Sequence, residues 1–125
     1  MIIEISTGEA LDKLSILRIK LQNIKDPEKI INIRKEHDHI SSKCQDILLN
    51  QNISILYKDL VKVNSLLWNI EDSLRDKEKK EQFDEHFIQL ARKVYITNDH
   101  RAEIKKLINT LTKSNFVEEK TYAKY

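Results

Sequence analysis

Apolar residues recur at alternating intervals of three and four positions along most of the chain. In the clearest series every position is aliphatic: Ile53, Leu56, Leu60, Val63, Leu67, Ile70 and Leu74. This spacing places the side chains along one side of an α-helix, as in coiled coils. Similar series precede and follow it, so the pattern predicts an all-α protein.

Local start signals divide the pattern into four predicted helices. Ser6 and Glu9 form a capping box, and Asp26-Pro27 supplies an N-cap followed by a proline at the first helical position. Asn52 and Asp84 are the predicted N-caps of the third and fourth helices. The predicted helices cover residues 7–25, 27–49, 53–78 and 85–113.

The predicted helices are joined by short links, which make sequence neighbours antiparallel. We therefore expect one domain over residues 1–125, an antiparallel, coiled-coil-like bundle with a long hairpin of the third and fourth helices. The apolar spacing continues through Thr97 and Arg101, which favours one helix over a division at Asn98-Asp99. The extra length of the hairpin leaves apolar surface, which favours a homodimer.

Both ends of the chain carry apolar residues outside the predicted helices. Met1 to Ile5 is short and rich in β-branched residues, which predicts a small strand or an arm tucked against the helices. The tail at 114–125 contains Phe116, Val117 and two tyrosines. It either folds back on the bundle or stays loose.

Composition supports the helical prediction and narrows the classes of partner. The chain has one glycine and one proline, too few for the turns of a β-rich fold. Its net charge is +2, and acidic and basic residues alternate along the chain, which disfavours nucleic-acid binding.

The single cysteine, Cys44, has no internal disulfide partner. The sequence shows no signal peptide and no apolar run long enough to span a membrane, so we expect a cytoplasmic protein.

Two polar residues, Thr97 and Arg101, occupy core-type positions in the fourth helix. A buried arginine is costly without an anionic partner. The first hypothesis is a structural ion pair with Glu71, which lies late in the preceding, antiparallel helix. Charges on the first helix, including Asp12, Lys13 and Lys20, are expected to be solvated.

The second hypothesis is a pocket for a phosphate or carboxylate ligand. Asn98, Arg101 and Lys105 share one helical face and would bind the anion. The other candidate binding residues are Trp68, Glu71 and Arg92.

Metal, cofactor and nucleophile motifs are weak. Glu36 and His39 have the spacing of di-iron bundles, but such sites need two copies of that motif. His37 falls on the apolar face and is predicted to be a hydrogen-bonded core histidine. Cys44 also lies on the apolar face, where a thiol behaves as a small apolar group. We expect no metal site and no cofactor.

The chain resembles a small family of uncharacterised bacterial proteins over its full length. The matching segments are Ser6–Glu9, Asp12–Lys20, Leu67–Asp72, Leu90–Tyr95, Asn98-Asp99, Arg101-Ala102 and Val117–Tyr122. The resemblance implies no activity, because the family is a domain of unknown function. It implies that the family pattern includes Asp12, Lys13, Lys20, Trp68, Glu71, Arg92, Asn98 and Arg101.

Two functions remain open from the sequence. The first is a non-catalytic helical interaction or accessory module that self-associates, or binds a partner protein, through its apolar faces. The alternative is a small binding protein or enzyme for an anionic metabolite, built around Arg101. The sequence favours the first, because no reactive constellation stands out.

Overall fold

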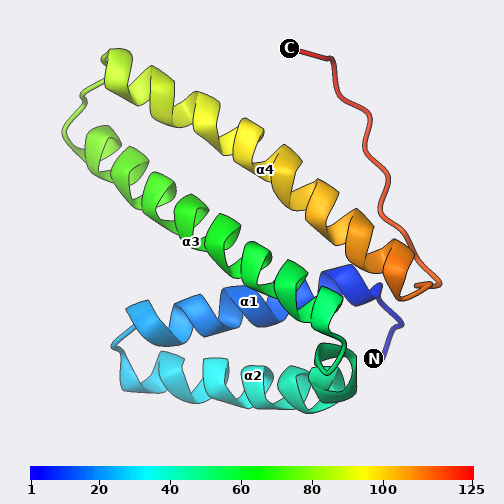
Figure 1. Cartoon of the computed structure of the whole chain (residues 1–125). Helices are drawn as coiled ribbons and strands as arrows, with labels where there is room; N and C mark the ends of the chain where they lie inside the picture. The colour runs from blue at the N-terminus through cyan, green and yellow to red at the C-terminus, as the bar shows by residue number, and fades with distance from the viewer.

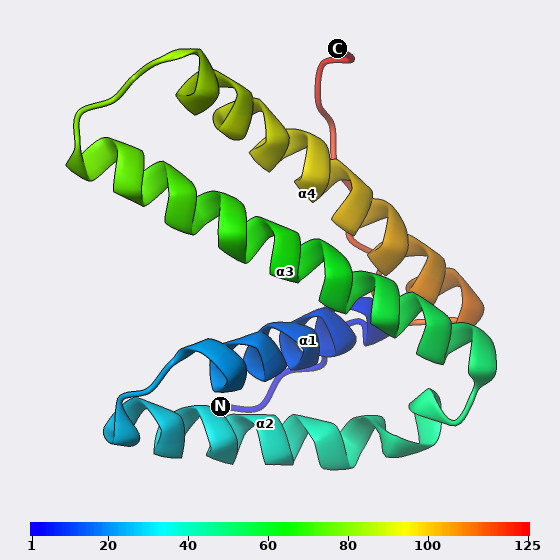
Figure 2. The ribbon, with the colours of Figure 1, turned by 60° about the vertical axis from the view of Figure 1, so that its left-hand side comes forward.

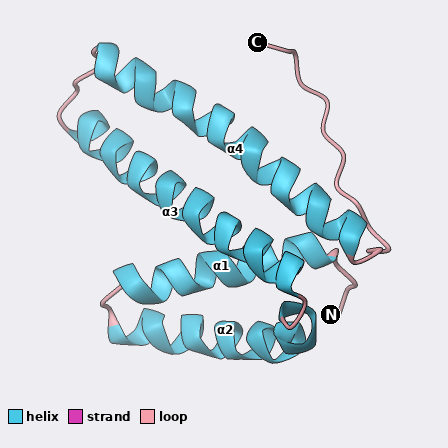
Figure 3. Ribbon diagram, viewed as in Figure 1, coloured by secondary structure: helices cyan, strands magenta, loops and turns pink.

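The computed structural model describes residues 1–125 and contains four α-helices and no strand (Figures 1 and 3). The helices are α1 (Thr7–Asn23), α2 (Pro27–Leu48), α3 (Gln51–Lys79) and α4 (Glu85–Leu111). The predicted all-α class is confirmed, and α3 and α4 form the predicted long hairpin. Residues 85–111 form one helix, so the division at Asn98-Asp99 does not occur.

Side-chain caps begin the helices, mostly where the sequence predicts. The side chains of Ser6, Asp26 and Asp84 each accept a hydrogen bond from a backbone amide of the following helix. The predicted cap at Asn52 is wrong. The Asn50 side chain accepts from the amides of Asn52 and Ile53, so α3 begins two residues earlier than expected.

Helix α1 is the central helix of the molecule. It packs against α2, α3 and α4, whereas α2 does not pack against α4. Figures 1 and 2 show two antiparallel hairpins, α1–α2 and α3–α4, that cross each other, with one end of the α3–α4 hairpin projecting beyond the crossing. The arrangement is therefore a pair of crossed hairpins with α1 between its neighbours.

The core lies where the hairpins cross. All four helices contribute to it, through Leu11, Leu14, Cys44, Ile53, Leu60, Val63, Ile104 and Ile108. Because α1 is covered on several sides, polar residues of this helix are buried as well: Asp12 is 1% exposed and Ser15 is 0% exposed. The crossing thus encloses the polar groups that make up the candidate site.

With glycine nearly absent, α3 and α4 end on other residues in the left-handed conformation. Glu81 has a φ of 53° and Lys113 a φ of 50°. The Gln82 amide donates to the Lys77 carbonyl at 2.9 Å, and the Ser114 amide donates to the Asn109 carbonyl at the same distance. This is the Schellman motif of helix C-termini.

The two ends of the chain differ in how they contact the helices. Ile2 and Ile3 are exposed and the arm forms no strand, so both predictions for it are wrong. The tail does fold back toward α4 (Figure 1). The Ser114 hydroxyl accepts from the Thr7 amide at 3.2 Å, and the Tyr125 hydroxyl donates to Asp99.

Candidate functional site

A buried ion pair joins α1 to α4. The Nε of Arg101 donates to Oδ1 of Asp12 at 2.8 Å, and its Nη2 donates to Oδ2 of the same carboxylate. The arginine side chain is 27% exposed and the aspartate side chain 1%. A two-point contact of this kind fixes the plane of the guanidinium.

The carboxylate of Asp12 is held in turn by residues of α1 and α3. Asn64 Nδ2 donates to Asp12 Oδ1 at 2.9 Å and to the Ser15 hydroxyl at 2.7 Å. The Ser15 hydroxyl donates to the Asp12 carbonyl at 2.6 Å. Every buried side-chain nitrogen and oxygen of the protein has a hydrogen-bond partner. The polar layer is therefore complete within the chain.

The predicted pairing of Arg101 with Glu71 is wrong. Glu71 remains half-exposed and contacts only Arg75, at 3.9 Å on the same helix. The expectation that Asp12 is solvated is also wrong, because α1 is enclosed by its neighbours. Asp12, Ser15 and Asn64 are thus the site residues that sequence reasoning missed. The one signal for Asp12 was its place in the family resemblance.

The carboxylate of Asp12 neutralises the positive charge of Arg101, which the second hypothesis expected to attract an anionic ligand. The hydrogen bonds that Arg101 donates to Asp12 raise the pKa of Arg101 above its ordinary value and outweigh the opposite effect of burial. Arg101 therefore stays charged, with its counter-ion supplied by the protein.

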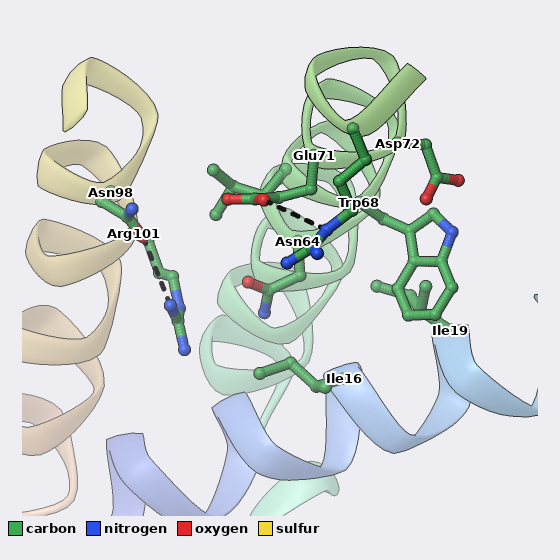
Figure 4. Close-up of a pocket in the computed structure, with 10 residues that line it drawn as sticks. Ile16, Ile19, Asn64, Trp68, Glu71, Asp72, Asn98 and Arg101 are labelled. Atoms are coloured by element: carbon green, nitrogen blue, oxygen red, sulfur yellow. Dashed lines mark hydrogen bonds and ion pairs between the residues drawn. The ribbon is translucent and has the colours of Figure 1, made fainter. Parts of the chain in front are cut away.

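A cleft of about 390 Å³ lies beside this layer, between α1, α3 and α4 (Figure 4). Its lining residues are Ile16, Ile19, Asn64, Leu67, Trp68, Glu71, Asp72, Arg75, Asn98 and Arg101. Figure 4 shows Asn98 and Arg101 on one side, Trp68 and Glu71 on α3, and Ile16 at the base. Four of the six candidate binding residues thus meet in one place.

The other two candidate binding residues lie outside this cleft. Arg92 is exposed, and its Nη1 donates to Gln89 at 3.2 Å. Lys105 lies on the other side of Arg101, where its Nζ contacts Glu9 at 2.7 Å and Glu118 at 2.9 Å. Because the Glu9 side chain pairs with Lys105, it does not accept from the Ser6 amide, which is the second hydrogen bond of the predicted capping box.

The contacts of Lys105 attach the tail to the helices. Burial alone lowers the pKa of Lys105, but the hydrogen bonds to Glu9 and Glu118 outweigh it and raise that pKa. The same bond lowers the pKa of Glu118. At the end of the tail, the hydrogen bond to Asp99 raises the pKa of Tyr125 to about 12.

Other chemically active groups are scattered. No group of three or more His, Cys, Asp or Glu side chains is arranged to hold a metal ion. Cys44 is buried, and burial raises the pKa of its thiol. His37 is not in the core: its side chain is 25% exposed, and its Nδ1 lies 3.0 Å from Asp38. None of the four helices is both long and apolar enough to cross a membrane.

Comparison with known proteins identifies the family. A family model, described as a family of unknown function (DUF6165), matches residues 1–125, the full length seen in the sequence resemblance. No curated protein and no solved structure matches the chain. The chain therefore belongs to the DUF6165 family, whose function is unknown.

Proposed function

We propose that this protein is a non-catalytic helical module that self-associates through the outer side of its α3–α4 hairpin. The observation that carries the proposal is a row of exposed aliphatic side chains, here called the outer strip. Its members are Ile55, Leu66, Ile96, Leu107 and Leu111, which are between 42% and 55% exposed.

The outer strip faces away from α1. Residues two positions apart on a helix point roughly 200° apart. Leu66 lies two positions after Asn64, which bonds to α1, and Leu107 lies two positions after Lys105, which also bonds to α1. Both leucines therefore point to the opposite side of the hairpin.

The strip is continuous across both helices. Ile55 and Leu107 line one apolar depression of about 330 Å³ together with Leu111. On α3, Leu66 lies about three turns after Ile55. On α4, Ile96 lies about three turns before Leu107. Because the helices are antiparallel, these intervals place Leu66 beside Ile96.

The accessible surface is large for the mass of the chain. It is 9099 Å² for 14.8 kDa, whereas a compact monomer of this mass exposes about 7,000 Å². A standard interface buries about 800 Å² on each partner. The exposed arm and tail contribute to the excess, together with the projecting hairpin. The accessible area in excess of a compact monomer is larger than the area that one partner buries in a standard interface.

A second copy of this chain is the occupant that we propose for the strip. A two-fold axis brings the same surface of each copy together, so an aliphatic row can cover itself. Asp59 and Lys62, with opposite charges, lie between the aliphatic positions on α3. A copy related by two-fold symmetry can therefore match charges as well as apolar groups.

The alternative, binding of an anionic metabolite at Arg101, has weaker support. Asp12 already neutralises that arginine, and Lys105 is neutralised by two glutamates. A non-catalytic role is supported by the buried thiol and by the enclosed, fully bonded polar layer.

The experiment is sedimentation velocity over a range of concentrations. We expect the unmodified protein to sediment as a dimer, and Leu66→Glu combined with Leu107→Glu to sediment as a monomer, because each glutamate places a charge in the strip. Ile31→Glu is the matched control, since Ile31 is 68% exposed on α2, outside the strip.

Circular dichroism checks that each variant retains its helices. A protein that is monomeric at every concentration, or a folded double variant that stays dimeric, would refute self-association through the outer strip.

A further inference from the structure

The cleft beside Arg101 has one apolar wall and two separate sets of polar groups. The wall consists of Ile16, Ile19, Leu67 and Trp68. Hydrogen-bond donors lie on α4, and carboxylates lie on α3 (Figure 4). The self-association proposed above uses the opposite side of the hairpin, so this cleft is a separate feature.

The α4 side of the cleft offers N–H donors without net charge. Asp12 takes the Nε and one Nη2 hydrogen of Arg101, and Asn98 Oδ1 accepts from Nη1 at 3.3 Å. A guanidinium has more N–H groups than these contacts use. The Asn98 amide nitrogen also remains free to donate. These groups suit a carboxylate oxygen of a ligand that carries no net charge overall.

The α3 side of the cleft offers carboxylate acceptors. Glu71 has a side chain that is 49% exposed, and its single ion pair is the 3.9 Å contact with Arg75. Arg75 is 80% exposed, so that contact contributes little. Asp72 lies beside Glu71 on the cleft lining and has no ion pair. The Glu71 carboxylate suits a primary ammonium group.

We propose that the cleft binds a small zwitterion with an apolar side chain, of the free amino acid class. Its carboxylate receives N–H bonds from Arg101 and Asn98, its ammonium contacts Glu71, and its side chain packs against Trp68. The Asp12, Ser15 and Asn64 bonds hold Arg101 in place before the ligand arrives, which lowers the cost of binding. The volume lies at the small end of the range for ligand pockets.

The chain carries its own reporter for this test. Trp68 is the one tryptophan and lines the cleft, so its fluorescence reports occupancy. Leucine, methionine and phenylalanine are titrated, and isothermal titration calorimetry is run in parallel to detect binding that leaves the indole unchanged. Two analogues of leucine separate its charges: 3-methylbutylamine lacks the carboxylate, and 4-methylpentanoate lacks the amine. Inorganic phosphate represents a simple anion.

We expect at least one of the three amino acids to bind saturably. When leucine binds, both of its analogues should bind at least about tenfold more weakly, because each loses one charge-assisted contact. The corresponding analogues apply when another amino acid binds best. Saturable binding of none of the three overturns the proposal. Equal binding of an amine-only analogue, an acid-only analogue or phosphate also overturns it.

A pair of variants locates the binding site. Glu71→Gln removes the charge proposed to contact the ammonium, and we expect it to weaken binding about tenfold. Glu78→Gln is the matched control, because Glu78 is exposed on α3 and lies outside the cleft. Both residues are at the surface, so both variants should fold. Equal affinity in Glu71→Gln and the unmodified protein would place any binding elsewhere and overturn the assignment.

Discussion

Asp12 is more deeply buried than Arg101, so the loss of either residue has a different cost in folding free energy. The carboxylate is 1% exposed, whereas the guanidinium keeps an edge on the cleft. A charge left unpaired in a closed layer costs several kcal/mol, while one at the edge can regain water. Loss of the arginine should therefore harm the fold more than loss of the aspartate.

The ion pair predicts a specific pattern in a double-mutant cycle. Arg101→Leu alone should lower the free energy of unfolding by about 3–5 kcal/mol, because Asp12 stays buried without its partner. Asp12→Leu combined with Arg101→Leu should recover most of that loss, since Asn64 keeps its bond to Ser15. Urea unfolding, followed by circular dichroism, measures each free energy.

The same cycle distinguishes Asp12 from the partner that the sequence indicates. Glu71→Leu added to Arg101→Leu should recover nothing, because Glu71 does not contact Arg101. Glu71→Leu alone should change stability by less than about 1 kcal/mol, as expected for a weak surface pair. Recovery by Glu71→Leu instead of Asp12→Leu would contradict the observed pairing.

At the scale of elements, ion pairs attach the tail to α4. Lys105 contacts Glu118 at 2.9 Å, and the next residue, Lys106, contacts Glu119 at 3.2 Å. The first pair is the better anchored, because the Lys105 side chain is 11% exposed and the Lys106 side chain 56%. Attachment of the tail therefore depends on the protonation state of Glu118.

We predict that acid releases the tail. The pKa of Glu118 is lower in the folded protein than in the unfolded chain, because Lys105 donates a hydrogen bond to it. Its contribution is therefore fully present above the ordinary glutamate pKa of about 4.3 and is lost as the pH falls through the lowered value. The heteronuclear ¹⁵N–¹H NOE of residues 114–125, measured by NMR, should fall across that window as the released tail moves faster.

Two variants test the assignment to Glu118. Glu118→Gln should loosen the tail at neutral pH and remove most of the acid dependence. Glu119→Gln is the control and should act weakly, since its pair with Lys106 is exposed. An unchanged acid response in Glu118→Gln would show that another group controls the tail.

At the scale of the whole molecule, α1 begins in close contact with the last turns of α4. The Gly8 amide donates to Asn109 Oδ1 at 2.7 Å, and the Thr7 amide donates to the Ser114 hydroxyl. Gly8 is the one glycine of the chain and is buried. A Cβ at this position would lie 2.6 Å from the Lys105 carbonyl oxygen. The missing side chain therefore sets how closely the hairpins approach.

Gly8→Ala should destabilise the protein, although alanine favours helix by about 1 kcal/mol over glycine. The added methyl group must displace backbone on α4, and overpacking of this kind typically costs about 1–3 kcal/mol. Thermal unfolding should show a lower Tm. Gln22→Ala, an exposed position late in α1, is the control and should leave Tm unchanged or higher. A Gly8→Ala protein with the Tm of the unmodified chain would contradict this view of the contact.

The helices and their inner faces are specified by residues that lie close together along the chain. The caps at Ser6, Asp26 and Asp84 and the aliphatic series of α3 depend on residues two to four positions apart, so they can be recognised locally. Trp68 and Glu71, the two candidate binding residues on α3, do share the cleft. The long hairpin followed from the short links and helix lengths.

Which polar groups meet depends on how the helices pack. Asp12 reaches Arg101 because α1 crosses between the other helices, and no local pattern specifies that crossing. The partners of Lys105 come from the first helix and from the tail, both far away in sequence. Periodicity reports which face of a helix is apolar, whereas the identity of the facing element depends on packing of the whole chain. For that reason the polar layer and its cleft could not be predicted from the sequence pattern and are visible only in the folded structure.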